Sequence, residues 1–242
     1  YSTEASGAQS IAMGYETTAS GWYSTAMGSG TTASGLYSTA MGRATTVSGW
    51  YSTAMGRNTT ASDYGSLVIG QYNSSGSSVT NSATSFSTSN TAFVIGNGTA
   101  SNAKSDAFKV MFNGDATVSN DLTVSGDVVV SSDARLKSNI VSLGSTLSRL
   151  LLIDGKSYEM KGKQKIGVLA QDIKEVFPEL VTEDSNEMLA VNYQGLVPVL
   201  INALKEQDGK IKEQQSEIEI LKQQQAEIEE LKEMVNRLIS SK

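Results

Sequence analysis

The first 71 residues repeat a pattern of small, polar and apolar positions every 14 residues. One series carries Ala-Ser-Gly or a close variant, and it begins at Ala5, Ala19, Ala33, Val47 and Ala61. A second series in the same phase carries Met-Gly or Ile-Gly, and it begins at Met13, Met27, Met41, Met55 and Ile69. Glycine permits positive φ at tight corners, and alternating Ser, Thr and Ala suit narrow strands that stack on one another. The period therefore predicts a coil of parallel β-strands.

A coil of this kind has a thin interior. Alanine and glycine would fill it, and they bury too little apolar surface to offset the conformational entropy lost on folding. Three coils packed together would bury more, so the repeats predict a homotrimer. Trp22, Leu36 and Trp50 recur at the same interval. This row fits packing between subunits best, and binding of a glycan is the alternative.

Residues 72–131 lose the period and form a connector rich in Ser, Thr, Asn and Gly. Short apolar runs interrupt the connector at residues 93–95, 107–112, 121–124 and 127–130. Asn-Gly and Ser-Gly pairs lie between several of these runs, as is typical of β-hairpins. We therefore expect β-strands at these runs, and from Asp106 to Val130 we expect them to be wound among the three chains of a trimer.

Residues 132–242 have the texture of an α+β domain that ends in a long helix. Apolar runs at residues 166–173, 176–181 and 191–200 would supply its core. We expect the helix to run from Asn192 to about Ile239, with Pro198 close enough to its start to be tolerated.

The expected helix carries an apolar stripe close to heptad spacing. The members of the stripe are Leu204, Ile211, Ile218, Leu221, Ile228, Val235 and Ile239. Gln207, Gln214 and Gln225 fall at inward positions, which favours a defined register. Residues 216–222 recur at 226–232, a heptad plus three, and this spacing should overwind the coil locally. The stripe predicts a three-stranded coiled coil over about residues 192–240.

Charge is distributed unevenly along the chain. The net charge is −6, and the charged residues among the first 100 are Glu4, Glu16, Arg43, Arg57 and Asp63. The largest basic cluster is the alternation of Lys161, Lys163 and Lys165, so we expect no binding to nucleic acid. No apolar run approaches the ~18 residues of a membrane span, so we expect no membrane insertion. The chain starts within its repeat pattern, and we interpret it as the C-terminal piece of a longer protein.

Composition also restricts the chemistry. The chain contains no histidine and no cysteine. A Ser-His-Asp triad, a Cys-His dyad and a histidine-ligated zinc site are therefore excluded, and we predict no metal and no cofactor. The main remaining route to a nucleophile is a serine whose proton is taken by a neutral lysine. Ser132 and Lys137 have suitable spacing, although taken alone the segment between them is more typical of a helix N-cap.

The 14-residue repeats resemble the heads of trimeric autotransporter adhesins and of many phage tail fibres. In those heads, repeats of this kind build a left-handed parallel β-roll that trimerises. The resemblance covers roughly residues 1–71 and implies a left-handed parallel β-roll there. With the β connector over residues 72–131 and the α+β domain that follows, we expect a mixed fold. The resemblance also implies an adhesive head or a spacer, which could bind a glycan or receptor on a host surface.

Four blocks of the C-terminal region resemble the intramolecular chaperone of endosialidase family. The blocks are Ser-Asp-Ala-Arg-Leu-Lys-Ser-Asn-Ile from Ser132, Gly-Val-Leu-Ala-Gln-Asp-Ile from Gly167, Phe-Pro-Glu-Leu-Val from Phe177 and Tyr-Gln-Gly-Leu-Val-Pro-Val-Leu from Tyr193. That domain ends phage tailspikes and tail fibres, trimerises, guides folding of the β-rich region before it and then cuts itself off. The resemblance implies an α+β chaperone and autoprotease domain over residues 132–242, on a virion tail fibre or at a cell surface.

The same resemblance assigns roles to individual residues. Ser131–Ser132 would be the scissile bond, Ser132 the nucleophile and Lys137 the general base. Lys137 must then be neutral, which requires burial or a nearby positive charge such as that of Arg135. For Arg135 solvation or a carboxylate partner is the simpler expectation, and for Asp133 a cap or an orienting hydrogen-bond acceptor. The alternative function is a non-cleaving, structural trimeric adhesin or stalk in which Ser132 only caps a helix.

Overall fold

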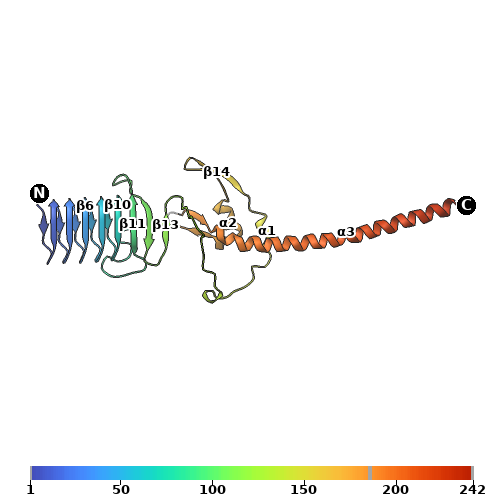
Figure 1. Ribbon diagram of the computed structural model, residues 1–242, viewed down its shortest axis with the longest axis horizontal. Coiled ribbons are helices and arrows are strands. Elements are labelled where there is room, and N and C mark those ends of the chain that lie inside the picture. Colours follow the sequence, from blue (N-terminus) through green and yellow to red (C-terminus); the bar gives the residue numbers. More distant parts are fainter. Residues whose placement is uncertain (1, 185–186, 241–242) are drawn as a thin grey trace. The chain divides into compact units, whose positions relative to one another are not determined.

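The computed structural model describes residues 2–184 and 187–240. The chain divides into two compact units, one ending at Val130 and the other beginning at Ser131. Figure 1 shows stacked strands in the first unit and the long helix α3 in the second. The first unit contains the strands β1 (Glu4–Ala5), β2 (Ile11–Tyr15), β3 (Thr18–Ala19), β4 (Thr25–Ser29), β5 (Thr32–Ala33), β6 (Thr39–Arg43), β7 (Thr46–Val47), β8 (Thr53–Arg57), β9 (Thr60–Ala61), β10 (Leu67–Gln71), β11 (Thr91–Asn97), β12 (Asp106–Met111) and β13 (Ala116–Val118).

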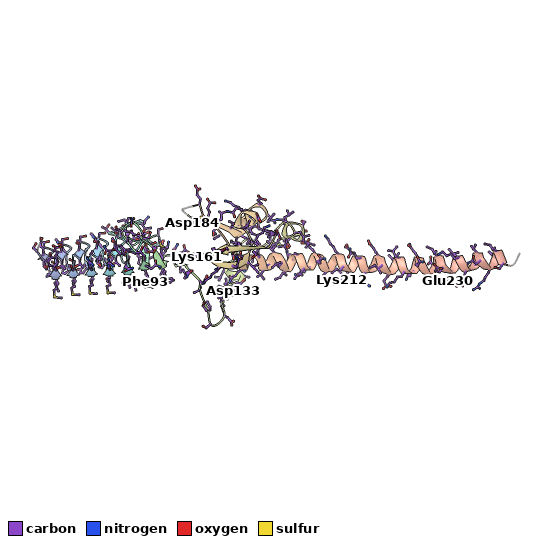
Figure 2. All side chains as sticks on the ribbon, turned by 90° about the horizontal axis from the view of Figure 1, so that it is seen from above. Phe93, Asp133, Lys161, Asp184, Lys212 and Glu230 are labelled. Atoms are coloured by element: carbon purple, nitrogen blue, oxygen red, sulfur yellow. The ribbon has the colours of Figure 1, made fainter. Side chains whose placement is uncertain are left out.

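Two sheets run through the repeats of the first unit. The short sheet has the order β1-β3-β5-β7-β9, and the long sheet has the order β2-β4-β6-β8-β10-β11, followed by β12 and β13. Pairs are parallel up to β11, and those from β2 to β10 are each offset by one repeat, so that Met27 lies beside Met13 and Met41. Figure 2 shows sulfur-bearing side chains projecting in a row from the stacked strands. The predicted coil of parallel strands is confirmed, as a parallel β-solenoid.

Glycine is required where one coil of the solenoid touches the next. Gly28 and Gly42 have φ values of 122° and 119°, which other residues rarely adopt. A Cβ atom added to either glycine would lie 1.9–2.0 Å from a carbonyl oxygen of the following coil. The glycines of the Met-Gly series therefore recur because the backbones of consecutive coils approach closely at these positions.

The interior of the solenoid is narrow and contains small side chains. Its fully buried apolar residues are Ala19, Ala26, Ala33, Ala40, Val47, Ala54, Ala61, Val68 and Val94. Threonine and serine side chains complete it, and Thr45 Oγ1 lies 3.1 Å from Thr59 Oγ1 in the next coil. A core made of such small groups buries little apolar surface per residue.

Two polar side chains close the short sheet at its last strand, β9. Asp63 stands where earlier repeats have glycine, and its buried carboxylate accepts hydrogen bonds from the backbone N–H groups of Thr80 (2.6 Å) and Thr91 (2.9 Å). The Asn73 amide pairs with both backbone groups of Thr60, at 2.8 and 2.9 Å. The loop after β10 thus satisfies a strand edge that a further coil would otherwise cover.

The connector is only partly made of strands. The expected runs at 93–95 and 107–112 lie in or overlap β11 and β12, and both strands extend the long sheet. The expected strands at 121–124 and 127–130 are absent, since the described range has no strand between Val118 and Lys156. A strand requires a hydrogen-bonding partner, and a single chain supplies none for these runs.

The second unit is built from short elements and one long helix. It contains the 3-10 helix η1 (Ala134–Leu136), α1 (Leu147–Leu150), β14 (Lys156–Met160), β15 (Lys163–Gly167), α2 (Ala170–Val176), the 3-10 helix η2 (Pro178–Leu180), β16 (Val181–Glu183), β17 (Leu189–Val191), the 3-10 helix η3 (Tyr193–Gly195) and α3 (Leu196–Ser240). The strands form two antiparallel pairs, β14-β15 and β16-β17.

A small apolar cluster holds the second unit together. Ile173, Phe177, Leu180 and Val199 are buried in it, so α2, η2 and the first turns of α3 share one core. The guanidinium of Arg149 on α1 lies 4.0 Å from the centre of the Phe177 ring, a cation–π contact.

The long helix begins close to the predicted residue. Asn192 caps η3 by accepting a hydrogen bond from the Gly195 N–H, and α3 then continues for 45 residues, on the order of 70 Å. The apolar stripe of α3 is largely exposed in the single chain, with Leu204 at 69% and Leu221 at 62%.

Candidate functional site

The candidate site is a single tight turn at the start of the second unit. The Asp133 side chain caps η1 by accepting a hydrogen bond from the Arg135 N–H at 2.9 Å. At the other end of the turn, the Lys137 N–H donates to the Ala134 carbonyl at 3.1 Å. The turn brings the side chains of Ser132 and Lys137 together, with 2.7 Å between Lys137 Nζ and Ser132 Oγ.

Asp133 and Arg135 form an ion pair with each other beside this contact. The Arg135 Nη2 and Nε atoms lie 2.6 and 3.0 Å from the two carboxylate oxygens of Asp133. The Arg135 guanidinium lowers the pKa of Asp133, with a smaller contribution from the Arg135 N–H, and Asp133 raises the pKa of Arg135. Arg135 therefore has a carboxylate partner in this chain, and its positive charge is balanced locally.

The site is open to solvent in the single chain. Ser132 and Lys137 are both exposed, and so are the apolar neighbours Leu136 (73%), Ile140 (68%) and Val141 (83%). A general base has to be a neutral amine, and water favours the ammonium form by solvating its charge. The geometry places the Ser132 hydroxyl and the Lys137 amine in contact. The single chain does not shield this pair from water.

The aromatic residues of the solenoid form a second candidate surface. Trp22 and Trp50 are 62% and 37% exposed, whereas the stacked rings are those of their neighbours. Tyr37 lies between Tyr23 and Tyr51, with ring centroids 4.7 and 5.1 Å apart. Stacking covers the ring faces that a sugar would use, and the sequence analysis did not predict these contacts between tyrosines.

The sequence analysis missed one residue that holds the segment following the candidate site. Glu206 on α3 accepts hydrogen bonds from residues at the start of α1, 60 positions earlier in the chain. Nothing in the local pattern distinguishes Glu206 from the other acidic residues of the helix, because its partners are distant in sequence.

Comparison with known proteins gives the class of each unit. Residues 132–182 match the family model of peptidase S74, described as chaperone of endosialidase. Segments 5–31, 21–45, 33–59 and 48–73 match the YadA head domain repeat. The chain is thus similar to YadA head repeats in its first unit and to the chaperone of endosialidase in its second, which confirms both resemblances.

Two curated relatives are phage proteins. The chain is 34% identical over 95 residues to the long tail fiber protein Gp37 of Enterobacteria phage K3, and the match covers 35% of this chain and 8% of that protein. The corresponding protein of Enterobacteria phage T2 is also 34% identical over 95 residues, and 7% of it is covered. The chain therefore spans less than a tenth of the length of these relatives. Among the residues that the structure describes, no helix is long and apolar enough to cross a membrane.

Proposed function

We propose that residues 132–242 are an intramolecular chaperone for a phage tail fibre. The chaperone trimerises, guides the β-rich region before it into register, and then releases itself by cutting the Ser131–Ser132 bond. The family match begins at Ser132, and the relatives are tail fibre proteins. The observation that carries the proposal is the 2.7 Å contact between Lys137 Nζ and Ser132 Oγ at that position.

The proposed reaction uses two steps. Neutral Lys137 takes the proton of Ser132, and the Ser132 oxygen attacks the Ser131 carbonyl carbon. The peptide C–N bond breaks, the amine of Ser132 takes up a proton, and an ester joins the Ser131 carbonyl to the Ser132 oxygen. Water then hydrolyses the ester, which leaves a carboxylate on Ser131 and a new N-terminus at Ser132. Asp133 and Arg135 support the reaction by holding the turn.

Trimerisation is proposed from two surfaces of the chain. The solenoid has a core of alanine, serine and threonine, which is weak for a structure standing alone. The apolar stripe of α3 is exposed along its length and has the spacing of a coiled coil. Neighbouring copies would cover both surfaces and would also shield Lys137 from water.

The head of the fibre is proposed to meet the host surface, where a glycan or a protein receptor would be its partner. The exposed Trp22 and Trp50 are candidates for such contacts, although packing between subunits would use the same residues.

The second candidate function is a non-cleaving trimeric stalk. The observation in its favour is that Asp133 caps η1 and pairs with Arg135, which gives the motif a structural role without any chemistry. Self-cleavage distinguishes the two functions.

The test is to express the chain and to determine the N-terminal residue of any small fragment by mass spectrometry. We expect a fragment that begins at Ser132. Ser132→Ala and Lys137→Ala should leave the chain uncleaved. The control Ser138→Ala removes a nearby hydroxyl outside the pair, and this variant should be cleaved like the parent. An intact parent chain supports the stalk, and cleavage of both variants at the parental rate indicates a contaminating protease.

A further inference from the structure

The segment that follows the Ser132–Lys137 turn is attached to α3 by one carboxylate. Glu206 accepts a hydrogen bond from the Ser145 hydroxyl at 2.6 Å and from the Leu147 N–H at 3.1 Å. The Thr146 N–H donates to the same carboxylate. Three donors from consecutive residues therefore converge on one side chain.

Two neighbouring contacts strengthen the attachment. The hydroxyl of Thr146, which is 1% exposed, donates to the Val199 carbonyl at 2.9 Å, and the Asn202 amide donates to the Gly144 carbonyl at 3.3 Å. Val199, Asn202 and Glu206 lie at helical spacings of three and four, so they share one face of α3. Residues 144–147 are held along that face.

The attachment is close to the candidate site along the chain. Only residues 138–143 separate Lys137 from Gly144, and the seven Cα–Cα steps between them span at most about 25 Å. All six are exposed, and none belongs to a helix or strand. The attachment of residues 144–147 therefore limits how far Lys137 can lie from α3.

We propose that Glu206 is a positioning residue for the cleavage reaction. It holds residues 145–147, which follow the Ser132–Lys137 turn, against α3, so that assembly of the α3 helices is transmitted to the scissile bond. This role rests on the proposed autoproteolysis. Glu206 touches neither Ser132 nor Lys137, and it acts through Ser145, Thr146 and Leu147.

The charge state of Glu206 supports this role. The Ser145 hydroxyl lowers the pKa of Glu206, and the Thr146 and Leu147 N–H groups and the charge of Lys210 add to the effect. Arg149, the charged residue of α1, is directed elsewhere, to the Val176 carbonyl and the Phe177 ring. The attachment is therefore formed by the ionised carboxylate.

The experiment compares release of the Ser132 fragment by the full chain and by Glu206→Ala and Glu206→Gln. The matched control is Glu213→Gln, one heptad later on the same helix, whose side chain is also exposed on α3. We expect Glu206→Ala to slow release roughly 10- to 100-fold, because displacing a reacting group by about an ångström has such an effect. Glu206→Gln, which keeps a carbonyl acceptor, should be intermediate, and the control should equal the parent. Light scattering should report the same oligomer for all four chains.

A cross-link provides the readout that a merely structural role would not change. The chain has no cysteine, so Ser145→Cys combined with Glu206→Cys places two unique thiols at the attachment. Joining the two thiols with a short bis-maleimide should restore fragment release in this double variant, although it lacks the Glu206 carboxylate. Parental rates in uncross-linked Glu206→Ala, or no recovery on cross-linking, would overturn the positioning role while leaving autoproteolysis intact. A parent that never releases the fragment refutes the proposed function and this role together.

Discussion

The Asn73 side chain pairs with Thr60 as a neighbouring strand would, donating to its carbonyl and accepting from its N–H. A single amide thus replaces the next coil of the short sheet. Asn73 is 1% exposed, so its removal leaves a buried strand edge without partners.

We predict that Asn73→Ala destabilises the last coils by about 1–3 kcal/mol, the usual cost of leaving buried polar groups unsatisfied. Amide hydrogen exchange at Thr60 should become faster. Asn81→Ala, which changes an asparagine in the same loop region, is the control. Unchanged protection of Thr60 in Asn73→Ala would show that the pairing contributes nothing.

A second prediction concerns the contact between coils. Gly42→Ala should destabilise the solenoid by about 3 kcal/mol or more, because its Cβ would lie 2.0 Å from the Gly56 carbonyl oxygen and its φ is 119°. Gly30→Ala should cost only about 1 kcal/mol, since the nearest atom is 3.9 Å away and Ala44 already adopts the equivalent conformation at φ 51°. Thermal unfolding of the two variants in the Ser132→Ala background measures the difference. Equal losses of stability in the two variants would contradict the close contact between Gly42 and the following coil.

The third prediction concerns the base in the proposed cleavage. Only a neutral amine can take the proton of Ser132. Lys137→Arg should abolish release at every pH, because a guanidinium stays protonated. Rates are measured by gel densitometry of freshly assembled chain. Cleavage by the arginine variant would exclude Lys137 as the base.

Acid should detach α1 from α3. The pKa of Glu206 is lowered in the folded chain, chiefly by the Ser145 hydroxyl, so the carboxylate stabilises the fold above the ordinary glutamate pKa of ~4.3. This stabilisation is lost as the pH falls from that value through the lower folded-state pKa. Exchange at the Thr146 and Leu147 amides, corrected for intrinsic rates, should increase over that window. In Glu206→Gln the same amides should show no such transition.

The last prediction concerns assembly. Parallel β-structure made of non-local contacts nucleates slowly, so residues 1–131 expressed alone should aggregate or stay monomeric. The same residues released by self-cleavage should remain trimeric and, once heated apart, should not reassemble, because the released chaperone no longer supplies the register. Light scattering before and after a heating cycle compares the two preparations. Equal trimer yields would refute the chaperone role even if cleavage occurs.

Much of this architecture follows from the sequence because its determinants are local or periodic. The 14-residue recurrence of Met27-Gly28 and its equivalents requires stacked strands, since each repeat meets only its neighbours. The apolar spacing of α3 and the cap at Asn192 likewise depend on residues within a few positions of one another. The spacing of Ser132 and Lys137 belongs to the same class, because one turn is enough to join them.

Other features depend on the tertiary structure because their partners are far apart along the chain. The roles of Asp63, Asn73 and Glu206 arise from contacts with residues 13 to 61 positions away, and no local pattern specifies such pairs. The runs at 121–124 and 127–130 have the composition of strands, yet they form none in the single chain, because a strand exists only where another strand offers its backbone. Sequence periodicity determines which elements can form, and the long-range contacts decide which of them are paired, capped and attached.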